Sequence, residues 1–232
     1  MPRKERISIG EVPHHVIQRG HNRSVCFFRA EDYRNYLKWL REYLQECQCS
    51  LHAFVLMTNH VHLLVTPETT DGLGQLMKRL GQRYVQYINR TYQRSGTLWE
   101  GRFRSCITEA ETYILNCYRY IELNPVRAGM VKHPGEYYWS SYRANAQGEN
   151  LNWLTPHTLY NQLGSTRKER LQAYRDLFQN HLESGIVDEI RKATNSDYAL
   201  GTKGFRRQVE KALGRRVSPG KIGRPRKQGS VP

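Results

Sequence analysis

The spacing of hydrophobic and polar positions along the first 145 residues predicts seven secondary-structure elements. Strand patterns occur at residues 12–19, 51–57, 61–65 and 102–108. Apolar residues recur at helical spacing over residues 30–47, 73–88 and 109–124. Only three residues separate the second and third strands, so these two strands are predicted to form an antiparallel hairpin.

The order of these elements predicts the fold class. It is βαββαβ followed by one more helix, which is the split βαβ arrangement of ferredoxin-like domains. We therefore expect an α+β domain over residues 1–145, with one antiparallel sheet and its helices on one face. Patterns such as that of residues 166–183 predict a helical extension over residues 146–214. A basic tail over residues 215–232, unstructured from about Val217, completes the predicted organisation.

Positive charge is concentrated near the C-terminus. The chain has 232 residues, with 36 Lys and Arg against 21 Asp and Glu, and a net charge of +15. Residues 201–232 contain ten Lys and Arg and one acidic residue, so they carry +9 of this total. Such a tail is typical of proteins that bind nucleic acid. We favour DNA over an acidic membrane, because the tail has no apolar face or lipidation motif.

One short motif stands out in the tail. Its sequence G-R-P, with Arg224 and Arg226, resembles an AT-hook that enters the A·T minor groove. General contacts with phosphate explain these arginines equally well.

Cysteine content and hydropathy indicate the compartment. The five cysteines are odd in number and form no C-x-x-C motif, which argues against a disulfide framework. No apolar run approaches the roughly 18 residues of a membrane span. The charged N-terminus also lacks the apolar segment of a secretory signal. We expect a cytoplasmic protein, associated with the nucleoid and with no membrane partner.

Two histidines form the first candidate site. Side chains alternate across a strand, so His60 and His62 are predicted to share one face of the hairpin while Val61 takes the other. Two imidazoles at this spacing can chelate one metal ion. Histidines of the core or surface would give the same pattern, but the end of a strand holds ligands rigidly.

The helix over residues 109–124 supplies the second candidate group. Tyr120 and Asn124 lie four residues apart, hence on one helix face. An amide oxygen beside two imidazoles would suit Mg²⁺ or Mn²⁺ holding a phosphate, next to which the tyrosine would stand. The alternative is that Tyr120 belongs to the apolar stripe that packs this helix. Tyr118, its nearest rival, is predicted to face away, since two residues turn a helix by about 200°.

Together these motifs resemble a known family. The sequences H-V-H, W-E-G-R-F-R, Y-R-Y-I-E-L-N-P-V-R-A-G-M-V and W-S-S-Y, and the opening H-V-I-Q-R-G-H-N-R, are similar to those of REP-associated tyrosine transposases. These are a branch of the single-tyrosine HUH nucleases. The resemblance spans about residues 1–145, and we infer no role from it for the residues that follow.

The resemblance implies an activity and a site. The activity is a metal-dependent endonuclease and strand transferase that acts on single-stranded DNA hairpins of repetitive extragenic palindromes, through a 5′-phosphotyrosine. The resemblance implies His60, His62 and Asn124 as metal ligands and Tyr120, on a catalytic helix, as nucleophile. A hairpin-binding protein or repressor without the chemistry remains the alternative. The exact DNA sequence and the oligomeric state, monomer or dimer, stay open.

Several basic residues near these motifs are candidates for binding DNA, although each could be an ordinary surface charge. The candidates within the motifs are Arg19, Arg23, Arg102, Arg104, Arg119 and Arg127. Arg3, Lys4 and Arg6 precede the first strand, in a segment that in this family helps to read a short sequence beside the hairpin.

Overall fold

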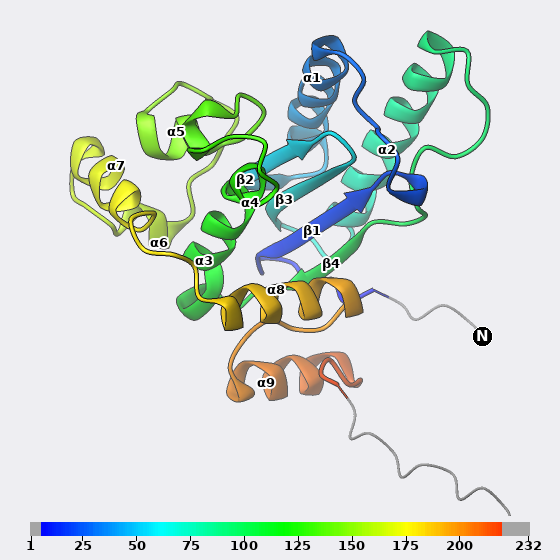
Figure 1. Cartoon of the computed structure of the whole chain (residues 1–232). Coiled ribbons are helices and arrows are strands. Elements are labelled where there is room, and N and C mark those ends of the chain that lie inside the picture. Colours follow the sequence, from blue (N-terminus) through cyan, green and yellow to red (C-terminus); the bar gives the residue numbers. More distant parts are fainter. Residues whose placement is uncertain (1–5, 220–232) are drawn as a thin grey trace, which may run out of the picture.

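Four strands form one antiparallel sheet in the computed structural model, which describes residues 6–219 (Figure 1). The strands are β1 (His14–Arg19), β2 (Cys49–Met57), β3 (His60–Pro67) and β4 (Arg104–Ile107). Their order is β2-β3-β1-β4, and every neighbouring pair is antiparallel. Helices connect β1 to β2 and β3 to β4. The predicted α+β fold with a split βαβ sheet is therefore confirmed.

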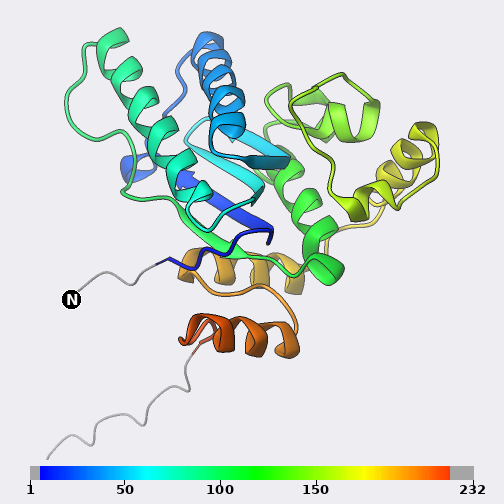
Figure 2. The same cartoon turned by 180° about the vertical axis from the view of Figure 1, so that it is seen from behind.

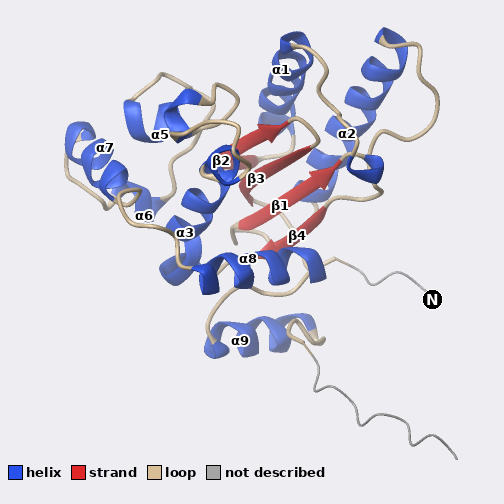
Figure 3. Cartoon of the chain, viewed as in Figure 1, coloured by secondary structure: helices blue, strands red, loops and turns tan. Residues whose placement is uncertain are grey.

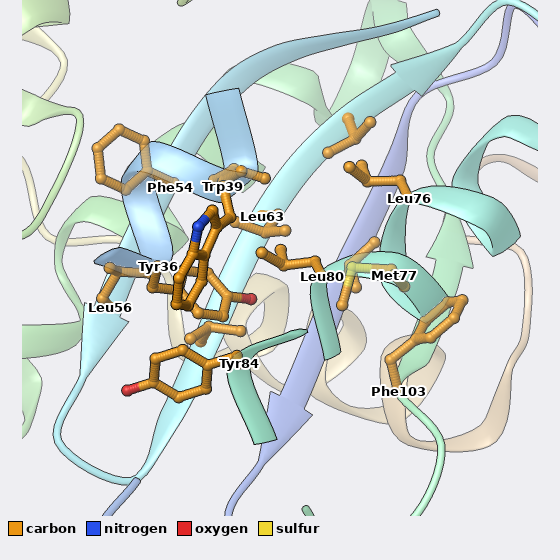
Figure 4. Close-up of a cluster of buried hydrophobic side chains, with 14 of the residues drawn as sticks. Tyr36, Trp39, Phe54, Leu56, Leu63, Leu76, Met77, Leu80, Tyr84 and Phe103 are labelled. Carbon is orange, nitrogen blue, oxygen red and sulfur yellow. The ribbon is translucent and has the colours of Figure 1, made fainter. Parts of the chain in front are cut away.

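Helices α1 (Ala30–Glu46) and α2 (Gly72–Thr91) cover one face of this sheet, as Figure 2 shows from behind. Figure 4 shows the core between them, where aromatic and leucine side chains of the helices meet the strands. Tyr36 and Tyr84 are completely buried there, with ring centroids 5.1 Å apart. The helices thus present their predicted apolar stripes to the sheet, which is the usual source of helix stability in a protein.

The opposite face of the sheet is also covered, so the prediction of helices on one face only is wrong. Helices α3 (Ala110–Glu122) and α8 (Ser184–Ser196) pack there (Figure 3). The reason lies in β2, where all residues except Ser50 are buried. A strand that is apolar on both faces must be covered on both faces. Within the predicted strand 51–57, residues 53–57 are all apolar rather than alternating with polar residues, and this pattern already indicated a strand that is buried on both faces.

Shorter helices complete the described chain: α4 (Asn124–Arg127), α5 (Tyr142–Gln147), α6 (Thr158–Asn161), α7 (Arg167–Asp176) and α9 (Lys203–Leu213), with 3-10 turns at His21–Arg23 and Pro134–Glu136. The helix predicted over residues 166–183 ends earlier, at Asp176. The apolar pattern continues past this end because Phe178 packs from the following turn against Tyr142 and Tyr174, with ring centroids 5.0 and 5.2 Å apart. Within residues 6–219, no helix combines the length and hydropathy of a membrane span.

The ends of the described chain pack together. Val217 is completely buried in a small cluster with Ile7, Ile107 and Val209, and its carbonyl accepts a hydrogen bond of 2.9 Å from the amide of Ala199. The packed chain thus includes the start of the tail that was predicted to be unstructured. Residues 220–232 of that tail, Arg224 and Arg226 among them, lie outside the described residues, as do Arg3 and Lys4.

Buried Glu122 joins the C-terminal extension to the first 145 residues. Its carboxylate accepts hydrogen bonds from Ser141 Oγ at 2.6 Å, Asn145 Nδ2 at 2.8 Å and Tyr174 OH at 2.6 Å. Burial raises the pKa of Glu122 to about 7, and the three donors only partly offset this effect. One carboxyl group therefore links α3, α5 and α7.

We predict that Glu122→Gln changes how stability depends on pH. Between pH 4.5 and 7 the folded protein retains a proton on Glu122 that the unfolded chain has lost, so the free energy of unfolding falls as pH rises. With a pKa of about 7, this fall amounts to about 3 kcal/mol. Urea unfolding at several pH values should show a shallower slope for Glu122→Gln. Replacement of exposed Glu149 by Gln should keep the wild-type slope, and equal slopes in all three proteins would contradict the role of Glu122.

Candidate active site

A cavity of about 250 Å³ lies on the sheet face covered by α3 and α8. Strand β1, strand β3, the junction of α3 and α4, and helix α8 all contribute to its lining. The lining residues are His15, Ile17, Arg19, His60, His62, Tyr120, Asn124, Arg191, Thr194 and Asn195. The structure thus brings together both predicted histidines, the predicted tyrosine and the predicted asparagine, which lie up to 64 residues apart in the sequence.

His60 and His62 share one face of β3, and their ring centroids are 5.1 Å apart. Asn59 Nδ2 donates to the carbonyl of Arg23, which turns Asn59 Oδ1 toward His60. His60 Nδ1 therefore donates to this oxygen, at 2.6 Å, and Nε2 stays free as a ligand atom.

Both histidines are neutral at ordinary pH. Burial, together with the nearby charge of Arg19, lowers the pKa of His60 to about 4. Burial, and to a smaller extent the neighbouring His15 and His60, holds the pKa of His62 well below its usual range. A neutral imidazole is the form that binds a metal ion.

Asn124 begins α4, directly after the end of α3. Its Nδ2 donates to the carbonyls of Tyr120 and Ile121, at 3.0 and 3.2 Å. Helix carbonyls at a C-terminus lack intrahelical partners, so these bonds hold the amide in one orientation. The amide oxygen, Oδ1, is thereby the atom that Asn124 offers to a cation.

Tyr120 lies against the imidazoles. Its ring is edge-on to His62 and His15, at centroid distances of 5.7 and 5.5 Å. The guanidinium of Arg127 lies 4.4 Å from the centroid of the same ring and also donates to the Tyr120 carbonyl. Burial lowers the pKa of Arg127 to about 10, which leaves it charged at neutral pH. A cation therefore lies over the face of the Tyr120 ring.

Tyr118 lies elsewhere. It is completely buried, its hydroxyl accepts a 3.0 Å hydrogen bond from the amide of His157, and its ring stacks with that of Tyr160. The helical geometry that predicted opposite directions for Tyr118 and Tyr120 therefore agrees with the structure.

The two residues that support His62 through hydrogen bonds, His15 and Thr194, were not among the sequence predictions. His15 Nε2 lies 2.8 Å from His62 Nδ1, and His15 Nδ1 lies 2.9 Å from Thr194 Oγ1. Strand alternation places His15 on the same face as Arg19, but the contact depends on the pairing of β1 with β3, which no local pattern reveals. Nothing in the sequence near Thr194 indicates a role in the site.

Besides Arg127, four arginines lie in or beside the cavity. Arg19 and Arg191 line it, and Arg19, Arg102 and Arg104 border a neighbouring small depression. Arg104 donates to Asn195 Oδ1, at 3.1 Å. Of the predicted DNA-binding residues, Arg19, Arg102 and Arg104 therefore lie in or beside the cavity, and Arg127 lies over the Tyr120 ring. Arg191 is a cavity residue that the sequence reasoning missed.

The other described candidates are placed differently. Arg6 donates to the carbonyl of Phe103 at 2.8 and 3.1 Å, and its guanidinium lies 3.6 Å from the centroid of that ring. Arg119 donates to the carbonyl of Asn180, at 2.5 Å. Exposed Arg23 lies in a 3-10 turn with a left-handed φ of 56°. Arg6 and Arg119 thus hold the fold together, and their contact with DNA stays a prediction.

The donor set fits a divalent cation. Over residues 6–219, no three His, Cys, Asp or Glu side chains gather as a metal-ligand group. Asn124 lines the same cavity as His60 and His62, and its amide could supply an oxygen ligand beside the two imidazoles. Two imidazole nitrogens and one oxygen, in a cavity open to further ligands, can hold a divalent cation that also binds a phosphate.

Comparison with solved structures finds proteins of similar fold. One, described as a REP-associated tyrosine transposase bound to a REP hairpin, has a TM-score of 0.56 and 17% identity, and the match covers 68% of this chain and 93% of that one. A transposase described as putative, from Deinococcus radiodurans R1, has 18% identity over 59% of this chain and 98% of its own. Its TM-score of 0.37 is too low to indicate the same fold. No curated protein sequence matches the chain.

The family comparison is more specific than the structural one. The family model described as "Transposase IS200 like" matches residues 9–124, which is half of the chain and runs from shortly before β1 to Asn124. The matched segment contains His60, His62, Tyr120 and Asn124 together with all four strands. The chain therefore belongs to the family of IS200-like transposases.

Proposed function

We propose that this transposase cleaves and rejoins single-stranded DNA at hairpins, with Tyr120 as nucleophile. One observation carries the proposal: the Tyr120 ring shares a cavity with two imidazoles whose Nε2 atoms are free and with the amide of Asn124. An apolar stripe that only packs a helix would not place its tyrosine against two neutral histidines. The family membership of the chain supports the same role.

The proposed reaction is a phosphoryl transfer. The Tyr120 oxygen attacks the phosphorus of a phosphodiester, its O–H proton passes to water, and the bond from phosphorus to the 3′ oxygen breaks. The products are a 5′-phosphotyrosine and a free 3′-OH, which takes up a proton. The Arg127 guanidinium over the ring stabilises the charge that develops on the phenol oxygen. The buried walls of the cavity strengthen this interaction.

A divalent cation, Mg²⁺ or Mn²⁺, would be held by His60, His62 and Asn124, and when bound it supplies a Lewis acid for a non-bridging phosphate oxygen. The three residues contribute by being preorganised. Asn59 orients His60, His15 orients His62, and two helix carbonyls orient Asn124. Such supporting bonds are characteristic of metal ligands in proteins.

Rejoining is the same chemistry in reverse. The phosphotyrosine keeps the energy of the phosphodiester bond, so a second 3′-OH can attack it and release Tyr120 without ATP. Cleavage followed by attack from a new 3′ end transfers the strand, which is the reaction a transposase requires.

The proposed substrate is a hairpin of the kind found in extragenic palindromic repeats, with a short sequence beside it. The solved transposase of similar fold is bound to a REP hairpin. In this chain, Arg19, Arg102, Arg104 and Arg191 gather beside the cavity. Such side chains neutralise phosphates and position a strand without reading its sequence.

An adduct assay tests the proposal. The full chain is incubated with labelled single-stranded hairpins and either Mn²⁺ or Mg²⁺, and covalent protein–DNA product is separated under denaturing conditions. We expect an adduct that depends on the metal and on the hairpin, together with a free 3′-OH fragment. Tight hairpin binding with no adduct under any of these conditions would instead identify a non-catalytic hairpin-binding protein or repressor.

A further inference from the structure

A chain of buried hydrogen bonds runs from helix α8 to the imidazole of His62. Thr194 Oγ1 lies 2.8 Å from the carbonyl oxygen of Ile190 and 2.9 Å from His15 Nδ1. His15 Nε2 in turn lies 2.8 Å from His62 Nδ1, and the two rings are stacked with an interplanar angle of 11°. Thr194, His15 and His62 are each at most 3% exposed, so water hardly competes for these bonds.

The first acceptor fixes the direction of every bond in this chain. A carbonyl oxygen only accepts, so the Thr194 hydroxyl donates its proton to Ile190 and must accept from His15 Nδ1. A neutral imidazole has one ring proton. Since His15 carries it on Nδ1, His15 Nε2 is an acceptor, and His62 donates to it from Nδ1. The lone pair of His62 Nε2 is therefore left free.

Cys106 on β4 completes the surroundings of Thr194. Its Sγ lies 3.3 Å from Thr194 Oγ1. Because the only proton of this hydroxyl already goes to Ile190, the thiol donates and occupies the remaining lone pair. The Thr194 hydroxyl thus has one donated and two accepted bonds, and no rotation would preserve them.

We infer that Thr194 is a positioning residue of the active site, which acts through His15 to hold His62 in the tautomer whose Nε2 can bind a cation. The binding of a cation by His62 rests on the proposed function, whereas the tautomer of His62 is a property of the protein without metal or DNA. Thr194 lies 179 residues from His15 and outside the segment 9–124 that the family model matches. The C-terminal extension therefore completes a site whose other residues come from the family's own region.

Tautomers can be measured directly in the metal-free full-length protein. The ¹⁵N chemical shifts of the two imidazole nitrogens distinguish a protonated from an unprotonated ring nitrogen. We expect His62 and His15 to be protonated on Nδ1 in the wild type. A wild-type spectrum with His62 protonated on Nε2 would overturn the inference, and this measurement needs no variant that could fail to fold.

Two substitutions test the hydroxyl. Thr194→Val keeps the shape of the side chain but cannot accept from His15, so His62 should shift toward the Nε2-protonated form, and Mn²⁺ affinity measured by calorimetry should fall about tenfold or more. Thr194→Ser keeps the hydroxyl and should match the wild type within about twofold in the same measurement.

The outcomes separate this inference from the proposed function. An unchanged tautomer and Mn²⁺ affinity in Thr194→Val would refute the role of Thr194. An equal loss in Thr194→Ser would also refute it, because that result would mean that packing by the methyl group matters rather than the hydroxyl. Failure of the wild type to form a DNA adduct would refute the proposed function and leave the ring spectra unaffected.

Discussion

Replacement of Tyr120 by Phe is expected to reduce the covalent protein–DNA adduct by at least about a thousandfold, because it removes the oxygen that forms the new bond. The ring itself remains, so its contacts with His15, His62 and Arg127 are kept. Hairpin affinity should therefore change little. The adduct is measured on denaturing gels, and affinity is measured by titration of a labelled hairpin in chelator.

Tyr118→Phe is the matched control on the same helix. It removes a hydroxyl that accepts a hydrogen bond from the amide of His157, 3.0 Å away. Leaving one buried donor without a partner costs stability, about 1–3 kcal/mol, but touches nothing in the cavity. The control should form the adduct normally. An adduct with Tyr120→Phe, or its loss in a folded Tyr118→Phe protein, would show that the nucleophile is wrongly assigned.

Local sequence patterns predicted the elements and the direct members of the site. Strand alternation alone puts His60 and His62 on one face of β3, and helix periodicity separates Tyr120 from Tyr118. Both relations involve residues within a single helix or strand, where backbone geometry determines the relative directions of the side chains. The proximity of Tyr120 to the histidines rested on the family resemblance, and the structure supplies the physical reason, since α3 packs on the face of β3 that carries them.

The residues that support this site depend on long-range packing instead. Orientation of His62 requires the pairing of β1 with β3 and the docking of α8 on β4 and β1. A shift of one residue in the register of β1 against β3 would move His15 to the other face of the sheet. Sequence spacing contains no information on such contacts when 179 residues separate His15 from Thr194. The same limit explains why α8 was predicted only as part of a helical extension.

Loss of either histidine ligand should be nearly as damaging as loss of the nucleophile. We expect His60→Ala and His62→Ala each to lower the adduct yield by more than about a hundredfold, beyond the loss of 10–100-fold that is typical when only a supporting partner of a ligand is removed. Mn²⁺ affinity of the metal-free protein should fall in parallel. Each variant removes one Nε2 lone pair that the structure leaves free, and the cavity offers no third imidazole to replace it, because both nitrogens of His15 are already engaged.

Control measurements separate lost coordination from a damaged fold. Exposed His181 lies in the loop between α7 and α8, and His181→Ala should retain both Mn²⁺ binding and the adduct. Excess chelator applied to the wild type should reproduce the defect of the two ligand variants without changing hairpin affinity. If cleavage continued undiminished in chelator, or if His60→Ala and His62→Ala bound Mn²⁺ as tightly as the wild type, the free Nε2 atoms would have no part in the reaction. Tyr120 would then have to act with arginines as its electrostatic support, namely Arg127 over its ring and Arg19 and Arg191 in the cavity lining.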